Sequence, residues 1–363
     1  MDLQSLREKL LQNIFGRFIL RAAAVFYGIG VRLNLFACKR GWRRSMRVNT
    51  RVVCIGNITT GGTGKTTAVL LAAGALARGG IRASIVSRGY KRKKAGDITI
   101  LFDRETAPDW RETGDEPYMM SQLLAEYKVP VIVSADRYGA ANAALKEFKS
   151  QVILLDDGMQ HHRLRRDANI VLIDAKNPFG GNALLPYGTL REPVSALKRA
   201  DLVVITHANL APVHIIEDIK DKIRVINDEI DILTAAHKPD YFFDLKERLH
   251  VPLDRLAGDI AAFSAIGEPA SFEQTLKNLG FNLKQAWRFA DHATYTRADI
   301  ENFAALSGGL PLITTFKDAV KLPEGWQDII KGKVYILAVN MEIQDNGLNK
   351  FMDVLYPQFS KRK

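Results

Sequence analysis

The sequence has few cysteines and no long uncharged apolar run. Its 363 residues include two cysteines, Cys38 and Cys54, too few for a disulfide framework or a thiolate metal site, which is typical of a reducing compartment. The longest uncharged run of the apolar N-terminal part, Ala22 to Val31, has 10 residues, whereas a membrane-spanning helix needs roughly 20. This part also has no small-residue cleavage site, so an export signal is not expected. Internal repeats and low-complexity segments are missing too, which argues against a repeat architecture.

What is present is an ordinary globular composition with an uneven charge. The chain is 47% hydrophobic and 25% charged, and its length leaves room for two hydrophobic cores. Residues 1–51 contain eleven Lys or Arg and two acidic residues, so +9 of the net charge of +11 lies there. The rest of the chain is therefore close to neutral.

In this basic segment apolar side chains are interleaved with the arginines. An apolar stripe with an Arg-rich flank is typical of a helix that lies on an anionic membrane surface or holds an acylated substrate. The alternative is an amphipathic helix packed on the protein's own core. Nucleic acid is not an expected partner, because the aromatic residues lie in the apolar stretch and no base-reading module is visible. We expect residues 1–50 to form a basic amphipathic arm.

A glycine-rich turn follows the apolar run 52–55 and precedes an alanine-rich helical pattern. Strand, glycine-rich turn, Lys-Thr and helix is the arrangement of a phosphate-binding P-loop, in which backbone N–H groups and the helix N-terminus face a polyphosphate. Lys65 is expected to reach the β- and γ-phosphates and the Thr66 hydroxyl to bind Mg²⁺. Thr59 stands where the motif normally has its first glycine. The expected nucleotide-binding residues are Thr59, Thr60, Gly61, Gly62, Thr63, Gly64, Lys65, Thr66 and Thr67.

Two other nucleotide-binding classes lack their defining residues here. Membrane-cycling partition ATPases place a lysine before the first glycine of this loop, and this chain has Thr60. GTPases need a base-reading Asn-Lys-x-Asp, but the apolar run 202–206 is followed by His207-Ala208-Asn209. ATP is therefore the expected nucleotide.

The apolar runs alternate with helical patterns over residues 51–225. This alternation predicts an α/β fold: a P-loop NTPase-like parallel sheet with helices on both faces, whose ligands bind at the carboxyl ends of the strands. The rhythm restarts after residue 226, which predicts a smaller C-terminal α/β domain, 226–363, that closes a cleft. The expected strands are 51–55, 83–86, 129–133, 152–155, 170–173 and 202–205, then 260–264, 310–314 and 334–339. The expected helices are 66–78, 116–127, 137–148 and 193–200, then 269–279, 297–307 and 347–357.

Asp156 and Asp157 follow the apolar strand 152–155. Carboxylates at the end of a strand beside the Lys-Thr of the loop hold Mg²⁺ in P-loop proteins; the alternative is an ordinary Asp-Gly turn. Several further loops would place polar groups at the same edge, although each also has a simple structural interpretation. They contain Arg88, Asp115, Gln160, His161, Arg191 and Glu192. The pair Asp291-His292 lies in the second predicted domain, and its simple interpretation is also structural.

Taken in order, these motifs resemble one family, the tetraacyldisaccharide 4′-kinases of the lipid A pathway. The resemblance spans about residues 52–321, and the family's threonine at the start of the loop accounts for Thr59. The chain departs from the family pattern at Thr67, Lys91, Ala293 and Phe316. The matching stretches are 56–66, 87–90, 114–117, 136–137, 155–161, 185–188, 190–193 and 291–292.

The resemblance implies transfer of the ATP γ-phosphoryl group to the 4′-hydroxyl of an acylated, anionic glucosamine disaccharide 1-phosphate. It also implies a peripheral location on the cytoplasmic face of the bacterial inner membrane. Asp115 is expected to accept the hydroxyl proton, with His292 beside it and Lys65 on the phosphates, while Asp157 remains an alternative base. The expected Mg²⁺ ligands are Thr66, Asp156, Asp157 and Glu192. The expected substrate contacts are Asn57, Arg88, Arg137, Gln160, His161 and Arg191.

Two other functions remain open from the residues alone. A membrane-cycling switch ATPase would also have a P-loop and a basic amphipathic arm, but it would have no need of Asp291-His292. A regulatory nucleotide-binding module would bind ATP without turnover.

Overall fold

The computed structural model describes residues 3–42, 44–90, 92, 97–103, 108–357 and 359. Its strands form one 13-stranded sheet with the order β11-β10-β12-β13-β8-β7-β6-β1-β5-β2-β4-β3, and β9 pairs with β8. The strands are β1 (Arg51–Asn57), β2 (Ala83–Ser87), β3 (Thr99–Leu101), β4 (Val131–Val133), β5 (Val152–Asp156), β6 (Ala168–Asp174), β7 (Leu202–Thr206), β8 (Asp231–Asp244), β9 (Leu249–Pro252), β10 (Asp259–Ser264), β11 (Asn282–Arg288), β12 (Leu312–Thr314) and β13 (Val334–Ile343).

The α-helices lie at both ends of the chain and between the strands. They are α1 (Leu3–Leu11), α2 (Ile14–Lys39), α3 (Lys65–Arg78), α4 (Trp110–Thr113), α5 (Asp115–Leu124), α6 (Arg137–Phe148), α7 (Val213–Arg224), α8 (Pro269–Asn278), α9 (Arg297–Leu306), α10 (Phe316–Ala319), α11 (Trp326–Ile329) and α12 (Leu348–Leu355). Of the predicted helices, 193–200 is a 3₁₀-helix, Val194–Arg199.

The P-loop part has a parallel sheet with helices on both faces, as predicted. Strands β7, β6, β1, β5, β2 and β4 run parallel, and only the edge strand β3 is antiparallel. Successive side chains of a strand point to opposite faces, so Val53 packs with α3, α5 and α12 while Val52 packs with α6 and α7. Burial on both faces explains why these strands are continuous apolar runs.

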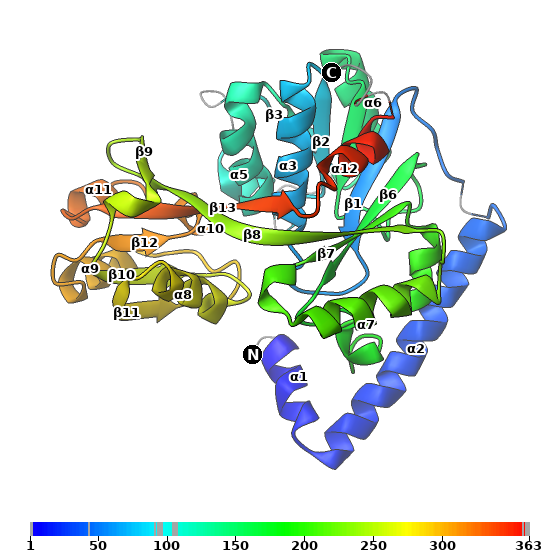
Figure 1. The fold of residues 1–363 in the computed structure, drawn as a ribbon, viewed down its shortest axis with the longest axis horizontal. Helices are drawn as coiled ribbons and strands as arrows, with labels where there is room; N and C mark the ends of the chain where they lie inside the picture. The colour runs from blue at the N-terminus through cyan, green and yellow to red at the C-terminus, as the bar shows by residue number, and fades with distance from the viewer. Residues whose placement is uncertain are drawn as a thin grey trace.

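Strand β8 joins the two halves of the sheet. Its first part, Asp231 to Thr234, pairs in parallel with β7, and the part from Ala235 to Asp244 pairs antiparallel with β13. Beyond β13 lie β12, β10 and β11, all parallel to it. Figure 1 shows β8 as one long strand between the two groups.

The end of the chain returns to the first group of strands. Helix α12 packs in the same core as α3, through Phe351, Met352 and Leu355 (Figure 1). A division of the chain at residues 225 and 226 therefore remains a prediction, because the last helix of the second region shares the core of the first.

The arm forms a V of two helices, α1 and α2, at the edge of the molecule (Figure 1). The side chain of Asn13 accepts a hydrogen bond from the Gly16 N–H and begins α2. In the ranges that the structure describes, α2 is the one helix long and apolar enough to cross a membrane, judged by length and composition alone. It exceeds the 10-residue uncharged run because the helix continues through Arg21 and Arg32.

Leu154 is fully buried in β5. Its replacement by alanine is expected to lower the free energy of unfolding by about 2–5 kcal/mol, because a cavity remains in the core. Denaturant unfolding measures this. The same replacement at Leu210, which is 54% exposed, should change it by less than about 0.5 kcal/mol. Equal losses at both positions would contradict the burial described here.

Candidate active site

The P-loop leaves the carboxyl end of β1 and enters α3. Gly64 begins the helix with φ 77°, a left-handed conformation that favours glycine. A Cβ there would also lie 2.6 Å from the ring of His237. Because Gly64 has no side chain to cap the helix, the first N–H groups of α3 are available to a phosphate. Lys65 and Thr66 follow directly.

The loop is also held from its two ends. The buried Asn57 side chain donates to Thr63 Oγ1 at 2.8 Å, so Asn57 supports the loop and does not line the cleft. The Thr60 N–H donates to the Thr189 carbonyl at 2.8 Å, and Thr59 forms a β-bridge with Leu190. The segment 184–191 thereby positions the first part of the P-loop.

Asp156 and Asp157 lie at the end of β5, next to β1, so they face the P-loop. Asp156 accepts a hydrogen bond from Ser87 at 2.8 Å, and Arg191 donates to both oxygens of Asp157, at 3.0 and 2.8 Å. Burial raises the pKa of Asp156 to about 7, with further contributions from the charges of Glu116 and Asp157. Burial would also raise the pKa of Asp157, but Lys65 and Arg191 outweigh it and lower that pKa.

These carboxylates suit a nucleotide-bound magnesium ion. Among the described residues, no three His, Cys, Asp or Glu side chains are grouped to hold a metal by themselves. A P-loop Mg²⁺ needs only one or two carboxylates, since phosphate and water oxygens complete its shell. Burial is the main cause of the raised pKa of Asp156, and the charges of Glu116 and Asp157 add to it. A divalent cation would balance these neighbouring negative charges.

Glu192 has a different environment from the other predicted metal ligands. Its carboxylate is 3% exposed and pairs with Arg199, and it accepts a hydrogen bond from Gln160 at 3.0 Å. Glu192 does not line the cleft, whereas Thr66, Asp156 and Asp157 do. Its role as a metal ligand therefore remains a prediction.

Asp115 and His292 meet across the cleft, although 177 residues separate them. His292 Nδ1 lies 2.8 Å from Asp115 Oδ2, and their side chains are 16% and 7% exposed. Asp115 is the first residue of α5, while His292 follows β11 in the second region. Burial would raise the pKa of Asp115, but the His292 hydrogen bond and the Lys317 charge outweigh it and lower the pKa. The carboxylate is therefore ionised and able to accept a proton.

The remaining predicted substrate residues lie around the same opening. Arg88, Arg137, Gln160, His161 and Arg191 all line a cleft of 2830 Å³. Burial lowers the pKa of Arg137 to about 10 and that of His161 to about 4, where nearby arginines add to the effect. His161 is therefore neutral at physiological pH.

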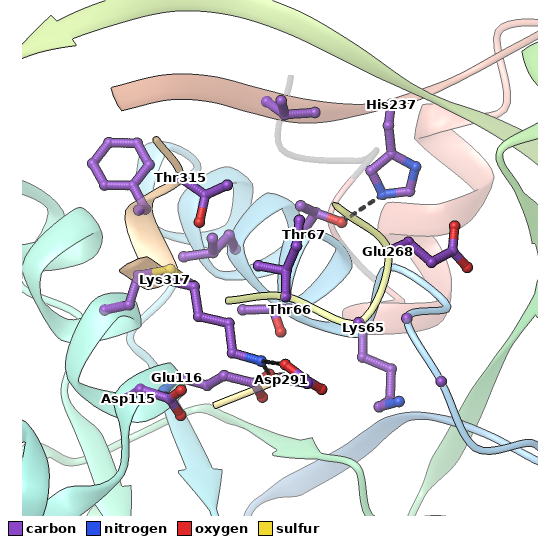
Figure 2. A pocket seen from close by; sticks show the side chains of 18 of the residues that line it. Lys65, Thr66, Thr67, Asp115, Glu116, His237, Glu268, Asp291, Thr315 and Lys317 are labelled. Atoms are coloured by element: carbon purple, nitrogen blue, oxygen red, sulfur yellow. Dashed lines mark hydrogen bonds and ion pairs between the residues drawn. The ribbon is translucent and has the colours of Figure 1, made fainter. Parts of the chain in front are cut away.

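Several residues of the site were not predicted from the sequence. Lys317 contacts Asp291 and Glu116 beside the Asp115–His292 pair (Figure 2). His237 of β8 is hydrogen-bonded to Thr67 at 2.8 Å and stacks on His207. Lys176 pairs with Glu268 across the cleft. Lys317 follows Phe316 in a stretch of the family pattern, but nothing in the local sequence indicated its contacts. Lys176 and His237 lie outside any motif that was recognised.

The arm also contacts the site from outside. Arg7 donates to the carbonyls of Pro186 and Tyr187 at 2.8 and 3.1 Å. Tyr27 donates to the Arg191 carbonyl at 3.0 Å. Helices α1 and α2 therefore hold the segment that supports both the P-loop and Arg191.

The site combines three features: a P-loop at the carboxyl ends of parallel strands, paired acids on the neighbouring strand, and an Asp–His pair over the opening. Together they define a P-loop kinase with a second region over its cleft. A protein-family comparison matches residues 16–356 to the tetraacyldisaccharide-1-P 4′-kinases. The chain belongs to this family. It is therefore a tetraacyldisaccharide 4′-kinase of lipid A biosynthesis.

Individual relatives agree over nearly the whole chain. The tetraacyldisaccharide 4′-kinase of Elusimicrobium minutum is 56% identical over 362 residues, which is 99% of this chain and 97% of that protein. The one from Halothermothrix orenii is 35% identical over 91% of this chain and 89% of its own. A crystal structure of LpxK from Aquifex aeolicus, an "apo" form in complex with ATP, superposes with a TM-score of 0.75 at 29% identity, covering 98% and 99% of the two chains.

The pH dependence of stability tests the environment of His237. Burial and the charge of His207 lower the pKa of His237 from 6.5 to about 3. Between these two pH values, the imidazole is protonated in the unfolded chain and neutral in the folded protein. This contribution to the free energy of unfolding is intact above about pH 6.5 and is lost as the pH falls toward about 3. Wild type should therefore lose more stability than His237→Gln between about pH 7.5 and about pH 5. Parallel losses in denaturant titrations would contradict a neutral buried imidazole.

Proposed function

We propose that the cleft binds ATP on the P-loop and the sugar end of tetraacyldisaccharide 1-phosphate beside Asp115, which accepts the 4′-hydroxyl proton during γ-phosphoryl transfer. The observation that carries this proposal is the 2.8 Å contact between Asp115 and His292, in a cleft that Lys65 and Thr66 also line. A carboxylate base must lie near both the acceptor hydroxyl and the phosphate. The ATP complex of the Aquifex aeolicus relative supports ATP as the donor.

The roles follow from the charges that line the cleft. Phosphoryl transfer depends mainly on positioning and charge neutralisation. Lys65 and the amides of the loop would hold the β- and γ-phosphates, and Arg191 would add a second cation at the γ-phosphate. Thr66 and Asp157 would hold Mg²⁺, with Asp156 behind them, and the ion would supply charge neutralisation on the phosphates.

His292 would keep Asp115 ionised and correctly oriented. Its Nδ1 contacts one carboxylate oxygen, and the Glu116 N–H donates to the other oxygen at 2.9 Å. Both contacts hold the carboxylate in one rotamer. The proton of the sugar hydroxyl then moves to an Asp115 oxygen as the hydroxyl oxygen bonds to the γ-phosphorus. The bond from the γ-phosphorus to the β–γ bridging oxygen breaks, and ADP leaves with that oxygen.

The cationic and polar groups on the opposite side of the opening would hold the anionic substrate. Arg88, Arg137 and Gln160 line the cleft and would contact the disaccharide or its phosphate. The acyl chains would extend toward the arm and the membrane. A position on the cytoplasmic face of the inner membrane accounts for an apolar α2 whose side chains Phe18 and Phe26 are 70% and 74% exposed.

Asp115→Asn and His292→Ala are each expected to reduce kcat by about 10²–10⁴, the range for loss of acid–base assistance. Residues that act as one unit are not additive, so the double variant should be little worse than the poorer single variant. Steady-state kinetics with ATP and the lipid substrate measures this, and the KM for ATP should change little. Wild-type kcat in Asp115→Asn would transfer the role of base to Asp157.

Membrane binding by the arm can be tested with substitutions that leave its contacts to segment 184–191 in place. Phe18→Ser with Phe26→Ser should weaken binding to anionic phospholipid vesicles by about tenfold or more, since each buried phenylalanine contributes ~1.5–3 kcal/mol. Vesicle co-sedimentation measures the affinity. Val225→Ser, at a site 88% exposed after α7, is the matched control and should bind as wild type does. Unchanged binding of the double variant would assign membrane contact to another surface.

A further inference from the structure

Lys317 contacts His292 and the two acidic residues next to the Asp115–His292 pair, Asp291 and Glu116. Its ammonium lies 2.9 Å from Asp291 Oδ1, 3.3 Å from His292 Nε2 and 3.4 Å from Glu116 Oε1. The side chain is 16% exposed. Figure 2 shows it extending from α10 toward Asp291 and Glu116, with Asp115 close by.

We propose that Lys317 is a positioning residue of the kinase: it fixes His292 in the neutral tautomer that carries its proton on Nδ1 and donates it to Asp115. The proposal rests on the proposed role of Asp115 as the base. Lys317 does not contact the reacting atoms in this account. It acts through His292.

The chemistry of the two side chains determines the tautomer. An ammonium group has three donors and no acceptor, so His292 Nε2 must be the acceptor where it meets Lys317. A neutral imidazole with an unprotonated Nε2 carries its hydrogen on Nδ1. That nitrogen lies 2.8 Å from Asp115 Oδ2. The hydrogen bond therefore runs from His292 to Asp115, which keeps the carboxylate as the proton acceptor.

Lys317 also pairs with Asp291, a second carboxylate that would otherwise compete with Asp115 for His292. Asp291 Oδ2 lies 3.7 Å from His292 Nε2, a position from which it would favour a proton on Nε2. Asp291 is instead paired with Lys317 at 2.9 Å through its other oxygen. Without the lysine, the imidazole would lie between two carboxylates, Asp115 and Asp291, and the tautomer with its hydrogen on Nε2, facing Asp291, would be favoured.

Buried hydrogen bonds of Asp318 and Ala265 fix the positions of Lys317 and His292 relative to each other. Asp318, next to Lys317, is fully buried and pairs with Lys321 at 3.0 Å. It accepts hydrogen bonds from the Ala265 N–H at 2.9 Å and from the Tyr295 hydroxyl at 3.0 Å. The His292 N–H donates to the Ala265 carbonyl at 3.2 Å. Both residues of the contact are thus fixed to one buried carboxylate.

Removal of the lysine charge should change the pH profile as well as the rate. The titratable and charged groups facing Asp115 are His292, Lys317 and Lys321, with Glu116 on its own helix and Asp291 behind His292. The Lys317 charge helps to lower the pKa of Asp115, so its loss should raise that pKa. The acidic limb of kcat/KM, below which the base is protonated, should therefore move to higher pH.

Lys317→Met is expected to lower kcat by about 10- to 100-fold, less than the 10²–10⁴ for loss of the base itself, with little change in the KM for ATP. Lys317→Arg should restore part of the loss, because the guanidinium also only donates. In a His292→Ala background, Lys317→Met should have little further effect. The control is Lys333→Met, which removes a lysine paired with Asp244 at 3.1 Å outside the cleft and should leave kcat unchanged.

The outcomes separate this proposal from the role of the Asp115–His292 pair. Equal losses from Lys317→Met with and without His292, or an unmoved acidic limb, would contradict it and indicate an independent contact to substrate. Wild-type kcat in both Asp115→Asn and His292→Ala would instead overturn the role of that pair. The ¹⁵N spectrum of the wild-type histidines tests the tautomer without any substitution. A His292 protonated on Nε2 would contradict the proposal directly.

Discussion

The pairing of β8 with β13 is the constraint on which the active site depends. It joins two groups of strands into one sheet and carries the second region over the carboxyl ends of the first. His292 and Lys317 thereby reach α5, which begins at Asp115. The same strand places His237 against Thr67 and Gly64 of the P-loop. A shift of this strand pair would therefore separate Asp115, the proposed proton acceptor, from His292, and it would also disturb the P-loop.

The charges of the cleft are arranged in two groups with different tasks. The first group is at the place expected for the phosphates and their metal ion, where burial, together with the charges of Glu116 and Asp157, raises the pKa of Asp156. Its members are Lys65, Arg191, Asp156 and Asp157. Asp115, His292 and Lys317 form the second group, in which the lowered pKa of Asp115 keeps the carboxylate that we propose as the proton acceptor ionised. Such a separation of electrostatic stabilisation from proton transfer suits phosphoryl transfer, which needs both.

Much of the fold and part of the site could be predicted from the sequence, wherever the local pattern is strong. Apolar runs buried on both faces predicted the parallel strands, and the P-loop motif predicted the β1–α3 turn. The pairing of Asp115 with His292 came only from the family resemblance, because no local pattern joins residues 177 positions apart. Strand β8 was missed because the polar run His237 to Asp240, which includes Pro239, interrupts its apolar residues, and a proline within a run argues against a strand. Glu192 was placed at the metal from its motif, whereas Arg199 and Gln160 occupy its carboxylate in the fold.

The central claim is that this cleft moves a phosphoryl group from ATP to a lipid hydroxyl. The most direct measurement incubates the full chain with γ-labelled ATP and tetraacyldisaccharide 1-phosphate and locates the label by mass spectrometry of the lipid. The account predicts label on the 4′ oxygen for the wild type and almost none for a folded Lys65→Ala protein, since Lys65 neutralises the transferring phosphate. Label found only in inorganic phosphate, or an active Lys65→Ala protein, would contradict it.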